Sequence, residues 1–155
     1  MEITNTKKAE LIQQSNDYTV KSLFLKGVGN NTDWTINFFY INPHRQSKVI
    51  TIPSTSPTSK NRACYQVMSD NVFFVINEKT TVLNKGQLFV VNQGLRHYFF
   101  NPNNNIAVVI MNYPGKLVFK KNIDTVNDLM PQVERRQKTP DQKFVELDPY
   151  SSFSS

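Results

Sequence analysis

The chain has 155 residues, of which 39% are hydrophobic, 12% aromatic and 19% charged, and its formal net charge is +6. This length and composition suit one domain with a buried core. The single cysteine excludes an intrachain disulfide and a cysteine zinc cluster. The N-terminus lacks a secretory apolar region, and no apolar run is as long as a transmembrane helix. We therefore expect an intracellular protein of a reducing compartment, without membrane association.

The first part of the chain alternates polar segments with short apolar runs. Residues 1–17 are polar with a weak helical period, and either a short helix or a disordered arm fits them. Strands are predicted at 18–25, 34–41 and 48–52, because β-branched and aromatic residues stand there between turn residues. The stretch 53–62 is rich in Ser, Thr and Pro and is typical of an exposed loop.

The middle of the chain is its most regular part. Further strands are predicted at 63–68, 72–76, 81–83, 88–91, 98–100, 106–111 and 116–119. Asn and Gly clusters separate them at short, even spacing, which is typical of consecutive antiparallel strands in an all-β sandwich or barrel. Runs this short fit no helical period.

These patterns divide the chain into an N-terminal arm (1–17), a β-barrel (18–120) and a C-terminal segment (121–155). The C-terminal segment is interpreted as a disordered tail or as an arm that packs on a partner. A short helix is predicted from 125 to 130, capped by Asp124.

One spacing in the middle of the chain is specific. Gly86 fits a tight turn before a strand, Gly94 fits a turn that requires positive φ, and Asn101 begins the following turn. Because side chains alternate along a strand, His97 and Phe99 would share one face.

This spacing resembles the second motif of the cupin superfamily, with Asn92 in place of the family's Pro. The resemblance implies a cupin-like double-stranded β-helix, a jelly-roll barrel. In the family's first motif two His and a Glu bind a metal, but Cys64, Gln66 and Asn71 stand at those positions here. His97 is the one match to a ligand, so we predict no metal, no cofactor and no catalytic residue. Cys64, Gln66 and His97 are expected to line the barrel lumen.

Within the superfamily, the pattern is most similar to the metal-free C-terminal cupin domain of the centromere protein C family, the kinetochore scaffold. The residues that carry the resemblance are Val72-Phe73-Phe74-Val75, Lys85-Gly86, Leu88-Phe89-Val90-Val91, Gly94-Leu95-Arg96-His97-Tyr98 and Asn101. The resemblance implies a nuclear, non-enzymatic module that forms homodimers and binds other proteins through its arms. That family's Arg-rich, Trp-containing nucleosome-binding motif is missing here.

Several strands are apolar on both faces. A barrel buries one face, so the other needs a further layer: a second sheet, the C-terminal arm or another subunit. We expect another subunit and assign five residues to that interface. They are Phe38, Tyr40, Phe73, Val75 and Phe99.

Two other functions remain open. A metal-free isomerase, epimerase or sugar-binding cupin would use His97 as a base beside Tyr65 or Tyr98; a roomy polar lumen favours it, and a lumen packed with Phe and Val opposes it. Nucleic-acid binding would use scattered basic residues and would weaken steeply with salt. Those residues are Lys7, Lys8, Lys21, Lys26, Arg45, Lys48, Lys60 and Arg62.

Overall fold

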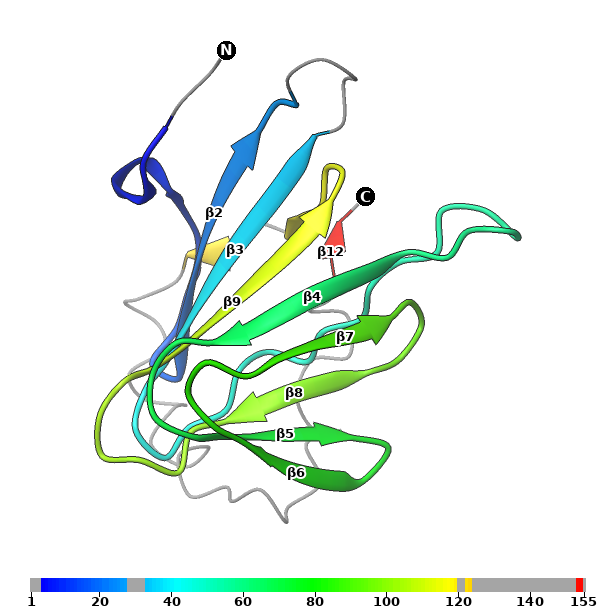
Figure 1. The fold of residues 1–155 in the computed structure, drawn as a ribbon. Coiled ribbons are helices and arrows are strands. Elements are labelled where there is room, and N and C mark those ends of the chain that lie inside the picture. Colours follow the sequence, from blue (N-terminus) through cyan, green and yellow to red (C-terminus); the bar gives the residue numbers. More distant parts are fainter. Residues whose placement is uncertain (1–3, 28–32, 120–121, 124–152, 155) are drawn as a thin grey trace.

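The computed structural model describes residues 4–27, 33–119, 122–123 and 153–154, which form two facing β-sheets (Figure 1). The larger sheet has the order β11 (Asn122–Ile123), β1 (Glu10–Gln14), β2 (Tyr18–Leu25), β3 (Trp34–Ile41), β9 (Ala107–Pro114), β4 (Arg62–Val67) and β7 (Leu88–Asn92). The smaller sheet has the order β6 (Lys79–Leu83), β5 (Val72–Ile76) and β8 (His97–Phe100). A short pair joins β10 (Val118–Phe119) to β12 (Phe153–Ser154).

Residues 44–52 run beside β8 and extend the smaller sheet. The Ser47 N–H donates to the Phe99 carbonyl at 2.8 Å, and Ile50 and His97 exchange backbone hydrogen bonds of 2.7 and 3.0 Å. The strand predicted at 48–52 is thus an extended segment joined to β8 through isolated bridges.

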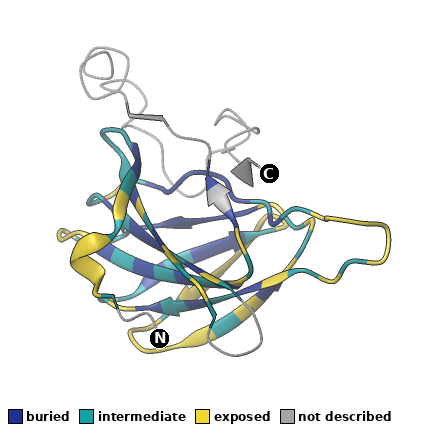
Figure 2. Cartoon of the chain, turned by 90° about the horizontal axis from the view of Figure 1, so that it is seen from above, coloured by how far each residue is buried: buried dark blue, intermediate teal, exposed yellow. Residues whose placement is uncertain are grey.

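The core lies between the two sheets. Phe39, Ile41 and Met111 contribute from the larger sheet, and Val72 and Phe99 from the smaller one. Along each strand, every second side chain points inward, so buried residues tend to alternate with less buried ones (Figure 2). Packing of these inward faces creates the barrel interior.

The turns show why Gly and Asn recur between strands. Asn77 and Glu78 have φ values of 50° and 63° in the two-residue turn between β5 and β6, as a tight hairpin requires. Gly86 and Gly94 have φ values of 87° and 83°, which a side chain would strain.

The prediction for the N-terminal arm needs correction. Residues 6–8 form a single 3₁₀ turn, but Glu10–Gln14 is β1 and pairs with β2 in the larger sheet. The register shifts between Leu11 and Gln13, so Ile12 and Gln13 are both buried. This irregularity removes the two-residue alternation by which a strand is recognised.

Apart from 48–52, the other predicted strands between 18 and 119 are present, with boundaries that differ by a few residues. The helix predicted at 125–130, with its Asp124 cap, lies outside the described residues. In the part of the chain that the structure describes, no helix has the length and apolarity needed to cross a membrane.

Replacing Asn101 by Ala should lower the free energy of unfolding by about 3 kcal/mol, measured by chemical denaturation. The fully buried Asn101 amide donates to the carbonyls of Ile41 (2.9 Å) and Asn105 (2.7 Å), and its side-chain oxygen accepts from the Asn103 N–H (2.9 Å). Asn104→Ala is the matched control, because Asn104 is exposed. Equal effects of the two substitutions would contradict this role for Asn101.

Candidate functional site

A hydrogen-bonded pair of side chains occupies the barrel interior. The Tyr65 hydroxyl on β4 lies 2.6 Å from Nε2 of His97 on β8, and His97 Nδ1 lies 2.8 Å from the Leu95 carbonyl. A carbonyl only accepts, so Nδ1 carries the proton and the Tyr65 hydroxyl donates to Nε2. Both side chains are fully buried, and both imidazole nitrogens are hydrogen-bonded within the protein.

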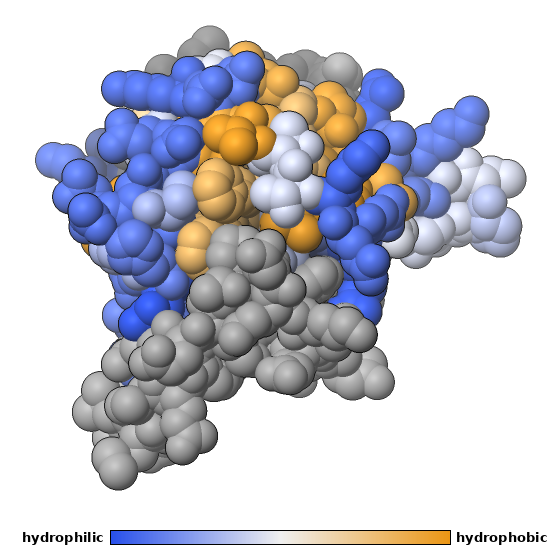
Figure 3. All heavy atoms as spheres, turned by 90° about the horizontal axis from the view of Figure 1, so that it is seen from below, coloured by the Kyte–Doolittle hydropathy of each residue, from blue (hydrophilic) through white to orange (hydrophobic). Residues whose placement is uncertain are grey.

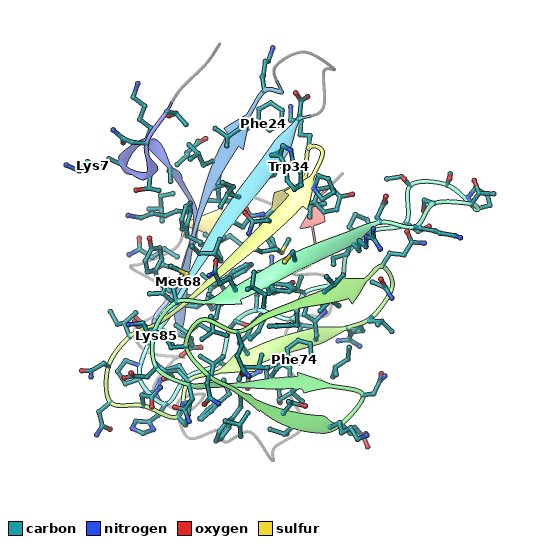
Figure 4. The ribbon with its side chains drawn as sticks, in the orientation of Figure 1. Lys7, Phe24, Trp34, Met68, Phe74 and Lys85 are labelled. Atoms are coloured by element: carbon teal, nitrogen blue, oxygen red, sulfur yellow. The ribbon has the colours of Figure 1, made fainter. Side chains whose placement is uncertain are left out.

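Aromatic rings surround this pair. The Tyr65 ring centroid lies 5.2 Å from that of Phe89 and 5.1 Å from that of Phe99, and the Phe74 and His97 rings are 5.7 Å apart. Figure 4 shows Phe74 among side chains between the sheets. The interior around His97 is therefore filled by Phe and Tyr rings.

Burial sets the charge state of the pair. It lowers the pKa of His97 from 6.5 to about 4, although the hydrogen bond to Leu95 acts in the opposite direction. Burial also raises the pKa of Tyr65 well above 10.0. At neutral pH both groups are uncharged. Both shifts disfavour transfer of the Tyr65 proton to His97, and a substrate would first have to displace the aromatic rings to reach the pair.

The predicted lumen residues are partly wrong. His97 faces the interior, but Cys64 and Gln66 are partly exposed and lie on the opposite face of β4. Tyr65 takes the interior position between them. Arg62, Cys64 and Gln66 share the outward face of β4, and the more apolar Ala63, Tyr65 and Val67 share the inward one. The alternation therefore indicates the inward face, and the error came from placing Cys64 and Gln66 at the ligand positions of the family's first motif.

The five predicted interface residues do not share one surface. Phe38 and Tyr40 lie on the outer side of the larger sheet, and Phe73 and Val75 on the outer side of the smaller one. Phe99 was assigned wrongly, because it is fully buried in the core. Phe38 and Val75 are 7% and 3% exposed, so the predicted residues lie on two opposite sheet faces and two of the remaining four are buried within the chain.

The outer side of the smaller sheet also carries Tyr98, one of the two tyrosines considered as a partner of His97. Tyr98 pairs with Val75 across β5 and β8, on the face away from the core cluster. Figure 3 shows apolar side chains among polar ones when the molecule is seen from the side of β5 and β6. Of the two tyrosines considered, Tyr65 is therefore the one in contact with the imidazole.

A large apolar surface covers the outer side of five strands of the larger sheet: β2, β3, β9, β4 and β7. We call it the outer face. Its apolar members are Leu23, Leu25, Trp34, Ile36, Phe38, Tyr40, Cys64, Leu88, Val90, Val108, Ile110 and Pro114. Leu88, Val90 and Trp34 are 61%, 56% and 44% exposed, whereas Leu23 and Phe38 are buried at 9% and 7%. At the outward positions of these five strands, Lys21 and Arg62 are the charged residues.

Comparison with known proteins gives similarity in structure alone. No family model matches the chain, and no curated protein matches it. The polyketide cyclase RemF from Streptomyces resistomycificus is 12% identical with a TM-score of 0.57, over 91% of this chain and 96% of that one. An RmlC-like cupin from Shewanella frigidimarina is 12% identical with a TM-score of 0.54, over 75% and 92%. The cupin domain of Schizosaccharomyces pombe Cnp3 is 13% identical with a TM-score of 0.49, over 72% of each chain.

The likeness to RemF and to the RmlC-like protein shows that the chain has the cupin fold. Cupins commonly bind a metal, but the residues here do not fit one. His97 is the sole imidazole that faces the interior among the described residues, and both its nitrogens are hydrogen-bonded. No group of three or more His, Cys, Asp or Glu side chains in the described ranges is placed to hold a metal ion.

Acid should destabilise the fold through His97. As the pH falls, unfolded His97 takes up a proton near 6.5, whereas folded His97 stays neutral to about 4. The unfolded state binds more protons in this window, so the free energy of unfolding should fall by about 3 kcal/mol between these pH values. The measurement is denaturation at pH 7 and pH 4.

The control is His97→Gln, whose amide can bond to both neighbours but does not titrate. Subtracting its pH dependence from that of the wild type isolates the contribution of His97, because other titrating groups are shared. Parallel pH dependence of the two proteins would contradict the burial of a neutral imidazole.

Proposed function

We propose that this cupin-fold chain is a non-enzymatic module that forms homodimers and binds other proteins. The observation that carries the proposal is the outer face of the larger sheet. Apolar surfaces of this extent on soluble proteins usually mark sites of interaction with other macromolecules. The proposal assigns the outer face to a second copy of the chain.

The small number of charges on the outer face supports a second copy as the occupant. Two chains that each carry +6 repel one another, so a contact between them needs a surface with few charges. The centre of the outer face is uncharged: Phe38 pairs with Ile110, and Tyr40 with Val108. Lys21 Nζ lies 5.7 Å from the Tyr40 ring centroid, where a cation–π contact partly offsets its charge.

The same face in a twofold arrangement would be self-complementary. Each outer face contacts its own equivalent across the axis, so one apolar surface supplies both sides of the interface. Obligate dimers bury large apolar areas of this kind. Of the predicted interface residues, Phe38 and Tyr40 keep this role in the proposal, whereas Phe73 and Val75 lie on the other sheet.

A small-molecule cupin is the second candidate, and the Tyr65–His97 hydrogen bond favours it. RemF, whose structure is similar to that of this chain, is a polyketide cyclase, which shows that this fold can support an enzyme. Against this candidate stands the packing of Phe74, Phe89 and Phe99 around the imidazole. A general base must reach a proton of its substrate, and here both nitrogens of His97 are already hydrogen-bonded.

Nucleic-acid binding receives less support from the structure than from the sequence. Lys48 is 2% exposed, with its Nζ 4.4 Å from the Phe119 ring centroid. Arg45 Nε lies 3.5 Å from an Asp17 carboxylate oxygen. With Lys21 at the Tyr40 ring, three of the eight basic residues considered above are thus engaged within the protein. The motif between 72 and 101 supports a nuclear, kinetochore setting instead.

Ile110→Glu tests the proposed interface. Ile110 is partly exposed at the middle of the outer face, so the monomer should fold, but a second copy would bury the new carboxylate. We expect the dimer dissociation constant to rise at least about 100-fold, measured by light scattering over a dilution series.

Val82→Glu is the matched control, because Val82 is 52% exposed on β6 of the smaller sheet. The control should remain a dimer. A dimer that Val82→Glu disrupts and Ile110→Glu preserves would move the interface to the other sheet and contradict the assignment.

A further inference from the structure

The last strand of the larger sheet has an open edge. β7 is hydrogen-bonded to β4 on one side, and no described strand lies on its other side. Its residues Leu88 and Val90 are 61% and 56% exposed, and Asn92 is exposed as well. β7 is thus the side of the larger sheet to which a strand can be added.

The direction of the β7 backbone groups follows from the pairing with β4. The Val67 N–H donates to the Gln87 carbonyl at 3.1 Å, and the Gln93 N–H donates to the Asn61 carbonyl at 2.8 Å. Gln87, Phe89, Val91 and Gln93 therefore direct their backbone groups toward β4, because ladder bonds alternate. The N–H and C=O groups between them, on Leu88, Val90 and Asn92, point away from β4.

Within the part of the chain that the structure describes, the edge also lacks the features that protect edge strands. Proteins usually place a charged residue, a proline or a covering segment there to prevent pairing with another chain. No charged residue and no proline occurs between positions 86 and 95. An exposed, uncharged strand whose outward backbone groups have no partner among the described residues is suited to accept another strand.

Charged residues stand near both ends of β7. Lys85 is exposed and precedes Gly86, whose N–H donates to the Val67 carbonyl at 2.7 Å; Figure 4 shows Lys85 near Met68, at that end of β4. At the other end, Arg62 is exposed and pairs with Asn92. The strand is thus neutral in its middle and positive at its ends.

We infer that the β7 edge binds an extended segment of a partner protein, with apolar side chains at alternate positions and acidic residues at its ends. This inference rests on the proposed function and names the partner chemistry of the interaction module. Backbone hydrogen bonds to Leu88, Val90 and Asn92 supply affinity, and the acidic ends meet Lys85 and Arg62.

A second copy of β7 fits the edge less well. A twofold axis through Val90 would pair each residue n with residue 180 − n of the other chain. Leu88 would then face Asn92 of the second copy, which brings Lys85, beyond one end of β7, toward the Arg62 that pairs with Asn92 in the other copy. Like charges would meet at both ends of the paired strands, which is unfavourable.

The test uses three labelled peptides and fluorescence polarisation. The first has the sequence Asp-Glu-Val-Thr-Val-Thr-Val-Glu-Asp, the second replaces its acidic residues by Lys, and the third copies Gly86–Gly94. We expect the acidic-ended peptide to bind at least tenfold more tightly than either other peptide. Tighter binding of the Gly86–Gly94 copy would make a second chain the occupant and overturn the inference.

Val90→Pro removes the outward N–H while leaving the hydrogen bonds to β4 intact, and it should weaken binding at least tenfold. Val90→Thr keeps the N–H and the branched side chain and should bind as the wild type does. Equal binding by the two variants would contradict the strand-addition geometry.

Hydrogen exchange of the wild-type protein tests the same geometry, and its result does not depend on whether a variant folds. Saturation with the acidic-ended peptide should slow exchange of the Leu88, Val90 and Asn92 amides at least tenfold, with little change at Phe89 and Val91. Unchanged exchange at the first three amides would overturn the inference.

The oligomeric mass, measured without peptide, separates this inference from the proposed function. A dimer that binds none of the peptides supports the proposed homodimer and overturns the inference at β7. A monomer that binds the acidic-ended peptide overturns the homodimer and supports the inference.

Discussion

The pleat of a β-strand sends neighbouring side chains to opposite faces, and the structure depends on which face each strand turns inward. On β4 the inward residue is Tyr65, and on β8 it is His97, which places the phenol 2.6 Å from the imidazole. Phe74, Phe89 and Phe99 then enclose the pair from neighbouring strands. A position that binds metal in many cupins thereby becomes part of the packed core.

The same constraint creates the outer face. Strands whose inward residues fill the barrel still carry Leu, Ile, Phe, Val and Trp at the outward positions. Burial of the inward face therefore leaves an outward apolar face. Its exposed residues, among them Trp34, Leu88 and Val90, are not covered by any described element. The interior offers little room for chemistry, whereas the exterior offers extended apolar surface and an open strand edge. This contrast is the physical basis for proposing an interaction module.

The strands between 18 and 119 were predictable because β-branched and aromatic runs alternate with Gly and Asn turns. β1 was not, because its register shift removes the alternation and buries both Ile12 and Gln13. The inward face of β4 could have been read from the sequence, because Arg62 and Gln66 make one face polar while Ala63, Tyr65 and Val67 make the other apolar. The comparison with the family's metal-binding motif assigned Cys64 and Gln66 to the lumen instead. The Tyr65–His97 hydrogen bond joins residues 32 positions apart, and no local sequence pattern predicts that these two side chains meet.

Sedimentation equilibrium of the wild-type chain at low and high salt tests the central claim most directly. The account predicts a particle of twice 17.9 kDa that persists at high salt, because apolar contacts are not weakened by screening. A chain that remains at 17.9 kDa at every concentration and salt level would contradict it. In that case the outer face would need another occupant.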